Sequence, residues 1–589
     1  MRHDPVGSTG ATTGWLAPSE SRVGLGCMRL WTGSGDDSAA ATVAAAVEAG
    51  ITVYDTARTY EGPGGEAGGN EQHLAQLLRM QAAGRSIRVV TKGGMRRQGT
   101  AWIPDGRARS IADDCETSLA ALGGIPIDLY LLHTPDPARP WRTSLRALAR
   151  LLDEGLVRRV GLSNVTRVQL EEAAGTIPVT AVEVALNPFD DSRLRDGTVT
   201  LCGEQGITVI AHSPLGGPRR VASLQRNAQL RDLAERHGVS AQEMTLAWEL
   251  GLGRNVVVIP GARRPRSVQS AVRSALLQLA GAEREELRRT LGRPAAVHVE
   301  TSRPRTAGDV VLVMGIPGAG KSRIAEGCVR RGYARLNRDL RGGSLRDLCT
   351  ALDDHLERGT RAVVLDNTWL TRAIRSRAVE VAARHGVAIR CVWLDIALAD
   401  AQRNAVERLL ARRDTLPAPE EVRGFDGRDG MISPTAQMRA LRELEPPSAD
   451  EGFVHVERRP FVRSSAQPPG SPGVFVAASA VWQPDATQTL AAEGSAHPHL
   501  VFDWRPDGNE VPLEMAVTGV REVVSGPVSG SLCPHPAGPP ACWCRPHLLG
   551  LVLQFARHRG IDPSRSVLIG TSPTHRSMAG TLGCRYVAV

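Results

Sequence analysis

The sequence predicts an α/β protein of several domains: a (β/α)8 TIM barrel, then a parallel α/β domain of the P-loop NTPase type, then a smaller α/β domain with a zinc loop. Three observations lead to this prediction. Eight β-branched runs alternate with amphipathic segments over residues 22–300. A glycine-rich loop at 315–322 follows an apolar strand, and three cysteines and a histidine cluster within 533–544. At roughly 100–200 residues per domain, the 589 residues allow two to four domains.

The composition favours a protein of the cytoplasm with an anionic partner. The formal net charge is +9, and a basic balance attracts polyanions such as nucleic acid. An arginine-rich protein without such a partner fits the charge equally well. The first residues lack the apolar core of a signal peptide, and no stretch approaches the ~20 apolar residues of a membrane helix. We therefore expect no membrane association and reduced cysteines.

The strands predicted for the first domain, residues 1–300, are short and evenly spaced. They span 23–28, 51–55, 87–92, 127–133, 158–163, 179–186, 207–212 and 255–260. Strands that alternate with helices pair in parallel. Eight such units in a segment of this length suit a (β/α)8 barrel.

Polar side chains stand at the C-terminal ends of these strands, which line the active site of such a barrel. Asp55, Lys92 and His133 each end a predicted strand, and Tyr60 follows shortly after Asp55. A lysine ammonium beside the Tyr60 phenol lowers the phenol pKa, and Asp55 holds the ammonium in place. The phenol can then protonate a carbonyl oxygen as hydride reaches the carbon, while His133 orients the carbonyl. This pattern predicts reduction of an unknown carbonyl substrate.

The first domain resembles the aldo-keto reductases over almost all of residues 20–300. The resemblance rests on GLGCMRL, DTARTY, TKGG, LLH, GLSN, SPLGG and IPGARRP. It implies NADPH as the cofactor and makes Asp55, Tyr60, Lys92 and His133 the catalytic tetrad.

The same resemblance implies a set of cofactor contacts. These are Ser163, Asn164, Glu183, Ser213, Arg263 and Arg264. Arg263 and Arg264 would hold the 2′-phosphate. Glu183 is a departure, because the family usually has Gln at this position to hold the nicotinamide amide. An acid there keeps a second hypothesis open, in which the barrel is a scaffold or a sensor that holds NADPH without turnover.

The second domain is expected over 309–461, after a linker at 301–308. Its loop GIPGAGKS follows the strand VVLVM and precedes a helical pattern. The residues assigned to ATP and Mg²⁺ are Gly315, Gly318, Gly320, Lys321 and Ser322. The glycines let backbone N–H groups cradle phosphate, Lys321 reaches the β- and γ-phosphates, and Ser322 holds Mg²⁺. The loop predicts phosphoryl transfer from ATP.

Further charged residues of this domain suggest the acceptor site. Asp339, in RLNRD, can accept a proton from an attacking hydroxyl, and Arg338 beside it is placed to hold an acceptor phosphate. Asp366 ends the strand AVVLD, where a carboxylate near Mg²⁺ is usual. The later arginines proposed for a cationic lid are Arg403, Arg408, Arg412 and Arg413. Most other arginines, Arg372, Arg375 and Arg377 among them, are expected on solvated helix faces.

The NRD and DNT motifs, the Arg-rich helix and the ending LEPPSADEGF resemble the kinase domain of the polynucleotide kinase-phosphatases over 309–455. The resemblance implies that Asp339 is the general base, that Arg338 contacts the acceptor phosphate and that Arg403 is functional. It also implies that the acceptor is the 5′-hydroxyl end of RNA or DNA, as in nucleic-acid repair. A P-loop specifies only the donor, so a sugar or a nucleoside stays an alternative, as does an enzyme that reduces and phosphorylates one metabolite.

The third domain is expected over 474–589, after a linker at 464–473. Cys533, His535, Cys542 and Cys544 give the pattern C-x-H-x6-C-x-C. Three thiolates and an imidazole make a closed tetrahedral Zn²⁺ site, which is structural because no position is left for water.

The stretch from CPHPAG to GCRYVAV resembles the histidinol-phosphate phosphatases of the haloacid dehalogenase (HAD) superfamily. Those enzymes need an aspartate nucleophile, a second aspartate and late acids, whereas this chain has Ala477, Ser479, Thr571 and His575 at those places. The lysine expected after the zinc loop is also missing. Without the nucleophile no aspartyl-phosphate can form. We expect a non-catalytic module that stabilises the protein or helps to bind substrate. A phosphatase that uses other residues is the alternative.

Overall fold

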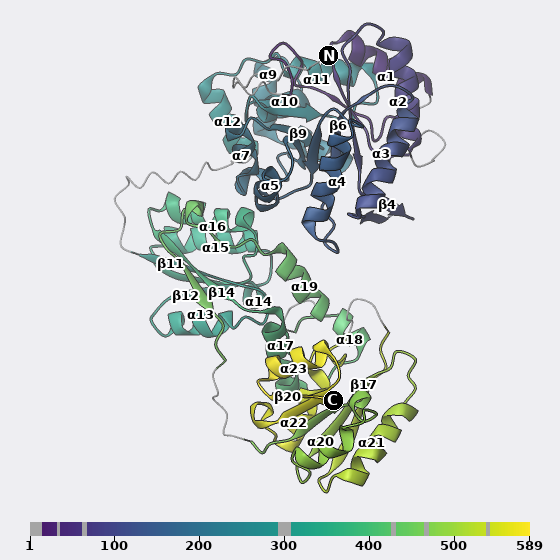
Figure 1. Ribbon diagram of the computed structural model, residues 1–589. Helices are drawn as coiled ribbons and strands as arrows, with labels where there is room; N and C mark the ends of the chain where they lie inside the picture. The colour runs from purple at the N-terminus through teal and green to yellow at the C-terminus, as the bar shows by residue number, and fades with distance from the viewer. Residues whose placement is uncertain are drawn as a thin grey trace, which may run out of the picture. The chain divides into compact units, whose positions relative to one another are not determined.

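The computed structural model describes residues 15–31, 36–61, 68–99, 101–291, 308–425, 431–463, 470–536 and 542–589. The chain divides into two compact units, Met1–Ala296 and Val297–Val589 (Figure 1). None of the helices within the described ranges is long and apolar enough to cross a membrane. The expected linkers at 301–308 and 464–473 lie largely outside the described residues.

Eight parallel strands form the sheet of the first unit, in the order β1-β2-β3-β6-β7-β8-β9-β10. They are β1 (Leu25–Gly26), β2 (Val53–Asp55), β3 (Arg88–Gly93), β6 (Ile127–Leu132), β7 (Val160–Ser163), β8 (Val179–Ala185), β9 (Thr208–His212) and β10 (Val256–Ile259). Gly24 N–H donates to the Val258 carbonyl at 2.8 Å, and Val258 N–H donates to Arg22 at 3.0 Å. These bonds close the sheet into a barrel, so the predicted barrel and its eight strands are confirmed.

Helices surround this barrel (Figure 1). They are α1 (Asp36–Glu48), α2 (Gly69–Gln81), α3 (Ala108–Leu122), α4 (Trp141–Asp153), α5 (Arg167–Ala174), α6 (Ser192–Arg195), α7 (Thr198–Glu204), α8 (Pro218–Arg226), α9 (Ala228–Arg236), α10 (Ala241–Leu250), α11 (Pro265–Ser274) and α12 (Gly281–Leu291). An antiparallel hairpin, β4 (Met95–Gln98) and β5 (Ala101–Pro104), is inserted after β3.

The period of two along each strand decides which side chains enter the barrel. The apolar cluster inside it contains Val53, Val90, Leu131, Ala181 and Ile210. Asp55, Lys92 and His133 each follow one of these residues by two positions, so they point inward as well. The sequence therefore places an apolar layer beneath a polar layer at the C-terminal rim.

The second unit begins with a parallel sheet in the order β12-β13-β11-β14-β15. Its strands are β11 (Asp309–Met314), β12 (Ala334–Asn337), β13 (Ala362–Asp366), β14 (Ala388–Asp395) and β15 (Val456–Pro460). Its helices are α13 (Lys321–Val329), α14 (Arg338–Arg341), α15 (Leu345–Glu357), α16 (Arg372–Arg384), α17 (Leu398–Arg413), α18 (Pro419–Arg423) and α19 (Pro434–Glu443). The strand, loop and helix order expected around residues 315–322 is present.

A second parallel sheet follows, in the order β18-β17-β16-β19-β20. Its strands are β16 (Val474–Ala477), β17 (His499–Trp504), β18 (Val528–Cys533), β19 (Val567–Gly570) and β20 (Arg585–Ala588). Its helices are α20 (Ala486–Ala492), α21 (Val511–Val523), α22 (Gly550–Arg559) and α23 (Pro573–Leu582).

Helix α17 belongs to the cores of both halves of the second unit. Val406 and Leu409 of α17 share an apolar cluster with Trp543 and Leu553 from the last sheet's half. Its N-terminal turn contributes Ala401 to a cluster beside the P-loop. The two sheets thus cluster as one unit, and the division into separate domains at 461 and 474 stays a prediction.

Candidate active sites

Lys92 lies at the centre of the polar layer of the barrel. Its side chain is 0% exposed, and its ammonium is ion-paired with Asp55 and lies 3.2 Å from Glu183 Oε2. Nζ also donates to the Thr56 carbonyl at 3.0 Å and lies 5.5 Å from the centre of the Tyr60 ring. The lysine therefore has two carboxylates around it where the sequence predicted one.

The electrostatics of this cluster combine burial with the charges of Asp55, Lys92 and Glu183. Burial lowers the pKa of Lys92, but Asp55 and Glu183 outweigh burial and raise it above its ordinary value. Burial raises the pKa of Tyr60, and Lys92 opposes that rise without reversing it. The predicted lowering of the phenol pKa by Lys92 is present, but burial outweighs it, so the pKa of Tyr60 stays above its ordinary value. At neutral pH Tyr60 is protonated beside a permanent cation.

His133 completes the expected tetrad. Its ring lies 5.9 Å from that of Tyr60, edge to face. Burial lowers the pKa of His133 to about 3, so the imidazole is neutral at physiological pH. Its Nδ1 is buried and has no hydrogen-bond partner among the described residues. A neutral ring with an unsatisfied polar atom suits a hydrogen bond to a bound carbonyl group.

Trp102 is a neighbour of this site that the sequence analysis missed. Its ring lies 6.2 Å from that of Tyr60 and 5.9 Å from that of His133, edge to face in both cases. It comes from the β4–β5 hairpin, where it is 36% exposed. A single aromatic residue in an inserted hairpin has no sequence pattern that ties it to the barrel rim.

The loops after β7 and β9 hold a second group of polar side chains. Asn164 Nδ2 donates to the His133 carbonyl at 3.0 Å, and Asn164 Oδ1 lies 3.2 Å from His212 Nε2. Asn164 and Ser213 have φ angles of 57° and 52°, in the left-handed region that is costly for residues with a Cβ and is common at functional sites. His212 was missed, although it follows the inward-facing Ile210 by two positions.

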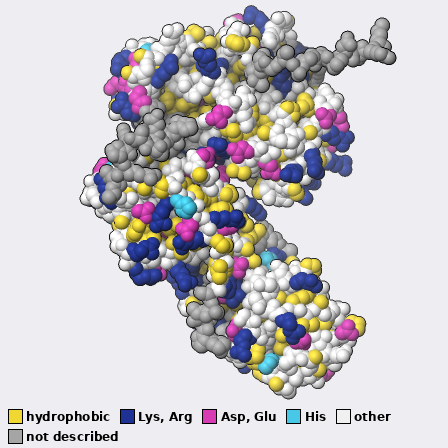
Figure 2. Space-filling model, turned by 60° about the vertical axis from the view of Figure 1, so that its left-hand side comes forward, with side chains coloured by type: hydrophobic (Ala, Val, Ile, Leu, Met, Phe, Trp, Pro, Cys, Tyr) yellow, Lys and Arg dark blue, Asp and Glu magenta, His cyan; other side chains and the backbone are white. Residues whose placement is uncertain are grey.

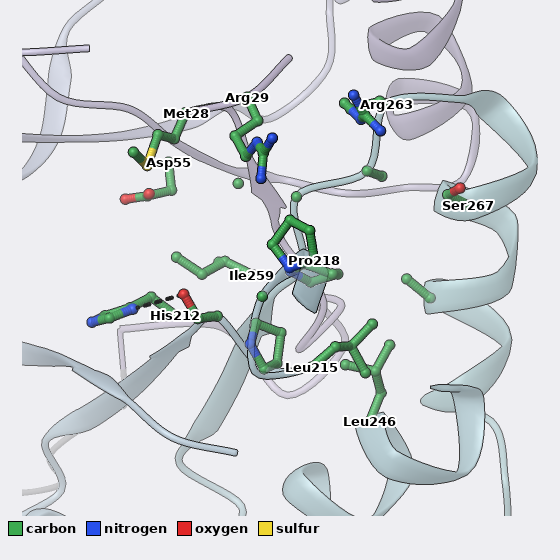
Figure 3. A pocket seen from close by; sticks show the side chains of 18 of the residues that line it. Met28, Arg29, Asp55, His212, Leu215, Pro218, Leu246, Ile259, Arg263 and Ser267 are labelled. Atoms are coloured by element: carbon green, nitrogen blue, oxygen red, sulfur yellow. Dashed lines mark hydrogen bonds between the residues drawn. The ribbon is translucent and has the colours of Figure 1, made fainter. Parts of the chain in front are cut away.

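These residues open into one cavity of ≈ 1150 Å³. All of the predicted cofactor-contact residues line it: Ser163, Asn164, Glu183, Ser213, Arg263 and Arg264. Figure 3 shows Arg29 and Arg263 along the edge of the cavity opposite Leu215 and Leu246. Arginine side chains therefore lie at one edge of the cavity, whose lining also includes Asp55 and Tyr60 of the polar layer.

The P-loop between β11 and α13 has the backbone that its glycines predict. Gly315, Gly318 and Gly320 have φ angles of 146°, 91° and 90°, which favour glycine. At Gly318 an added Cβ would lie 2.4 Å from the Ala401 carbonyl oxygen of α17. The glycines are thus needed both for the turn and for the close approach of α17.

Lys321 starts α13 and folds back over this loop. Its Nζ donates to the carbonyls of Gly315 and Ile316 at 3.0 Å each. Burial lowers the pKa of Lys321 to about 8, with Asp366 and Asp339 acting in the opposite direction and Arg408 in the same one. Asp339 and Asp366 therefore both lie within electrostatic range of the P-loop lysine.

The two predicted carboxylates differ in their surroundings. Asp339, on α14, is 37% exposed, and its Oδ1 lies 3.3 Å from Arg338 Nη2. Asp366 is 1% exposed, and its Oδ2 accepts from Arg335 Nε at 3.0 Å and from Asn337 Nδ2 at 3.1 Å. Asp339 is accessible to a substrate, whereas Asp366 is held from one side by Arg335, a partner that the sequence analysis missed.

Two arginines do not lie where the sequence analysis expected them. Arg403 is 8% exposed; its Nε donates to Glu407 at 2.7 Å and its Nη1 to the carbonyls of Thr581 and Leu582 at 2.8 and 3.0 Å. It satisfies the C-terminal carbonyls of α23, so its assignment to a phosphate lid is wrong. Arg375, expected on a solvated face, is buried and makes two bonds of 2.7 Å to Glu451.

The four predicted zinc ligands come together at the end of β18. The ligand atoms of Cys533, His535, Cys542 and Cys544 all lie within 4.8 Å of one another. Zn–S bonds of ~2.3 Å in a tetrahedral site place sulfur atoms about 3.8 Å apart, and Cys533 Sγ and Cys542 Sγ are 3.8 Å apart. The donor set fits a structural zinc ion, and the zinc itself stays a prediction.

The residues that stand in place of the phosphatase aspartates lie close together at one edge of the last sheet. Ala477, Ser479 and His575 line a cavity of ≈ 410 Å³ there. Ser479 Oγ and Thr571 Oγ1 are 2.8 Å apart. The cavity contains one carboxylate that the sequence analysis missed, Asp503 at the end of β17.

Comparison with protein families divides the chain in the same way. The model of the aldo/keto reductase family matches residues 22–290, and a model described as an AAA domain matches residues 310–424. The N-terminal unit is therefore an aldo/keto reductase domain, and the middle of the chain carries a P-loop, kinase-like AAA domain.

Individual relatives match the N-terminal part. An aldo-keto reductase of Strobilurus tenacellus, str7, is 29% identical over 41% of this chain and 78% of its own length. Probable aldo-keto reductase 1 of Glycine max is 28% identical over 45% of this chain and 84% of its own. A crystal structure of a thermostable aldo-keto reductase with the inhibitor epalrestat is 28% identical, with a TM-score of 0.40, and covers 46% of this chain and 95% of its own. An aldo-keto reductase of Klebsiella pneumoniae in complex with NADPH is 23% identical, with a TM-score of 0.40, over 47% and 93%.

Proposed function

From an aldo/keto reductase domain and a P-loop domain joined in one chain, we propose a two-activity enzyme. The first unit reduces a carbonyl compound with NADPH, and the P-loop domain transfers the γ-phosphate of ATP to the 5′-hydroxyl end of RNA or DNA. The observation that carries the first half is the buried Asp55–Lys92–Tyr60 cluster beneath a large cavity. The observation that carries the second is an exposed carboxylate, Asp339, within electrostatic range of Lys321.

The cavity of the barrel fits NADPH by the chemistry of its lining. Its volume exceeds the ~300–1,000 Å³ of pockets for drug-sized ligands. Arg263, Arg264 and the N-terminus of α11 would hold the phosphates, while Asn164 and Glu183 would face the nicotinamide end. When bound, NADPH supplies the hydride. The buried Oε2 of Glu183 lies 3.2 Å from Lys92 Nζ, so this ammonium balances the carboxylate.

The chain's own residues supply the proton of the reduction. Tyr60 is a protonated phenol in a water-poor site, and Lys92 stabilises the phenolate that remains after its proton moves to a carbonyl oxygen. His133, neutral and with Nδ1 unpaired among the described residues, orients the carbonyl. Trp102 forms an apolar wall beside both rings.

Phosphoryl transfer at the P-loop depends on positioning and charge. Lys321 would exchange its bonds to the carbonyls of Gly315 and Ile316 for the β- and γ-phosphates. Asp339 would accept the proton of the attacking hydroxyl, and Ser322 and Asp366 would hold Mg²⁺. Arg408, one of the four arginines predicted for the cationic lid, lies within electrostatic range of Lys321 and would contact the phosphates.

The choice of a polynucleotide acceptor rests on charge and on the NRD motif. On the face shown in Figure 2, Lys and Arg side chains are frequent over the part of the second unit that carries the P-loop sheet. Such a surface attracts phosphate backbones, with an affinity that falls as salt rises. Arg338, beside Asp339, would contact the phosphate next to the terminal hydroxyl.

The kinase proposal is tested with γ-labelled ATP and matched RNA and DNA oligonucleotides that carry 5′-hydroxyl ends. We expect label at the 5′ end, lost in Asp339→Asn and kept in Asp347→Asn, an exposed acid at the start of α15. Transfer of the label to a free nucleoside or sugar, but not to either oligonucleotide, would overturn the proposal that the acceptor is a nucleic-acid end. Full activity of Asp339→Asn would overturn the assignment of Asp339 as the general base.

A second candidate function, an NADPH-binding sensor, is favoured by Glu183, whose extra negative charge lies beside Lys92. The two are separated by following NADPH oxidation with simple aldehydes. We expect turnover that Tyr60→Phe abolishes, while tight NADPH binding persists in the variant. Tight binding without turnover for a broad panel of aldehydes and ketones would favour the sensor.

A further inference from the structure

The barrel cavity has exposed apolar side chains in its lining, whereas the proposed reacting groups are polar and recessed. Met28, Met95 and Trp102 line the cavity, and Met28 and Trp102 are 49% and 36% exposed. Tyr60 and His133, which would meet the carbonyl group, are only 8% and 9% exposed. A carbonyl group at the end of a narrow arm can therefore reach Tyr60 while the rest of its molecule covers the exposed apolar side chains.

Trp102 is held in place beside the reacting groups. It pairs with Arg97 across the β4–β5 hairpin, and Arg97 Cζ lies 5.1 Å from the centre of the Trp102 ring. Arg97 is in turn ion-paired with Glu61. The Trp102 ring lies 5.9 Å from the His133 ring. A partly exposed indole at this distance suits a substrate with a flat ring close to its carbonyl group, because nucleobases stack on aromatic side chains.

Charge contributes less to this hairpin than the indole does. Glu61 balances Arg97, and Arg96, whose side chain is 58% exposed, has its Nε 4.0 Å from Asp105 Oδ2. Because both cations have an acidic neighbour, we expect a nucleic-acid end to bind here mainly by stacking, with little dependence on salt. A small sugar aldehyde would leave the exposed indole and Met28 uncovered.

The proposed chemistry of the P-loop domain narrows the carbonyl compound to an aldehyde. The proposed acceptor is a 5′-hydroxyl group, which is a primary alcohol. Reduction of an aldehyde gives a primary alcohol, whereas reduction of a ketone gives a secondary one. A strand end that carries an aldehyde at C5′ has no hydroxyl group to phosphorylate there, and a single reduction converts it into the acceptor.

We infer that the barrel reduces the 5′-aldehyde end of a nucleic-acid strand and thereby makes the 5′-hydroxyl group that the P-loop domain phosphorylates. The inference rests on both halves of the proposed function. C5′ accepts a hydride from NADPH, which is oxidised to NADP⁺, and O5′ takes the proton of Tyr60 as the C=O double bond becomes a single bond; water then returns a proton to Tyr60. O5′ next attacks the γ-phosphorus of ATP, its proton passes to Asp339, and the bond to the leaving ADP breaks. The aldehyde must be supplied by a reaction that oxidises C5′ at a strand break.

The test uses the full-length protein, γ-labelled ATP, NADPH and an oligonucleotide whose 5′ end is an aldehyde. This strand has no 5′-hydroxyl group, so its 5′ end takes label only after reduction. We expect labelling that requires NADPH and disappears in Tyr60→Phe. A 5′-hydroxyl strand of the same sequence should be labelled with or without NADPH in both proteins. Mass spectrometry of the 5′ end follows the reduction independently of the kinase.

Variants of Trp102 test how the strand is recognised. Trp102→Ala should raise the KM for the 5′-aldehyde strand about tenfold, as expected for the loss of one base–aromatic stack, and should change the KM for propanal less. Trp102→Phe keeps an aromatic face and should retain most of the affinity. Trp482→Ala removes a 55% exposed indole of the second unit and should leave both KM values unchanged. Melting temperature identifies any unfolded variant.

The outcomes distinguish failure of the inference from failure of the proposed function. Failure to reduce any aldehyde, or to label the 5′-hydroxyl strand, would overturn the corresponding half of the proposed function and the inference with it. Reduction of propanal and labelling of the 5′-hydroxyl strand, without reduction of the 5′-aldehyde strand, would overturn the inference alone. More efficient reduction of a free nucleoside 5′-aldehyde than of the strand would also overturn it, because the substrate would then be a small molecule.

Discussion

Lys92, near the C-terminal end of β3, and Lys321, at the start of α13 after the P-loop, are both desolvated lysines, yet their surroundings move their pKa values in opposite directions. Two carboxylates outweigh burial and raise the pKa of Lys92. At Lys321 burial prevails and lowers the pKa to about 8, and its ammonium is bonded to backbone carbonyls.

The difference separates a lysine whose charge is balanced within the protein from one that awaits an anion. Lys92 needs no ligand to be stable and acts on the neighbouring phenol. Lys321 is incompletely compensated, and arriving phosphates would supply the missing negative charge. The same residue type therefore indicates acid catalysis in one fold and anion binding in the other, according to the carboxylates around it.

The most damaging change should be Lys92→Met, which keeps the volume but removes the cation between Asp55 and Glu183. Loss of one partner of a buried ion pair costs about 3–5 kcal/mol, so the melting temperature of the barrel should fall clearly and reductase activity should vanish. Calorimetry checks this. Adding Glu183→Gln should restore part of the lost stability by removing one unpaired charge, and a double variant less stable than the single one would contradict the comparison.

Lys321→Ala should reduce kinase activity by about 10²–10³, the range for loss of one group that stabilises developing charge. The lysine faces a loop rather than a carboxylate pair, so we expect little change in melting temperature. Single-turnover label transfer measures the effect. NADPH oxidation by the same preparation is the control and should stay unchanged.

The affinity for ATP should depend on pH through Lys321. Because the pKa of its ammonium in the free protein is lowered to about 8, the lysine loses its proton as pH rises through that value. In the ATP complex the negative phosphates would keep the lysine protonated to higher pH. Binding should be constant well below pH 8 and weaken by up to about tenfold per pH unit above it. In Lys321→Arg this inflection should disappear, because guanidinium stays protonated; its persistence would assign the titration to another group.

The smallest expected effect is that of Glu183→Gln on the choice between oxidised and reduced cofactor. A carboxylate beside the nicotinamide favours the cationic oxidised ring over the neutral reduced one. The variant should therefore bind NADP⁺ up to about tenfold more weakly, with NADPH affinity nearly unchanged. Equilibrium fluorescence titration with both forms measures the ratio, and an equal change for both would show that the charge is not felt at the ring.

Much of the fold was accessible from the sequence because the signals were periodic. Eight β-branched runs predicted eight barrel strands, and strand alternation placed Asp55, Lys92 and His133 inside the rim. The P-loop glycines were equally informative, because their pattern requires φ angles that other residues avoid.

The remaining errors concern side chains whose partners are distant in sequence. Arg403 lies on the expected helix, but its bonds go to the end of α23, nearly 180 residues later. Arg375 is buried against Glu451, which ends a single-turn 3₁₀ helix, Ala449–Glu451, too short to show a periodic pattern in the sequence. The proximity of Glu183 to Lys92 joins β8 to β3 across the barrel. Patterns within a short stretch of sequence cannot show which distant side chains will pair, because burial and tertiary packing decide the pairing.

Helix α17 has a consequence for any attempt to dissect this chain. One end lies within van der Waals reach of the phosphate loop at Gly318, and Val406 and Leu409 are interior residues of the last sheet's core. A fragment that ends before residue 470 would expose the apolar face of this helix to water and would remove the carbonyl groups that accept hydrogen bonds from Arg403. The C-terminal sheet therefore supports the P-loop through α17. Fragments of the P-loop domain without this sheet should aggregate, so that their loss of activity would say nothing about catalysis.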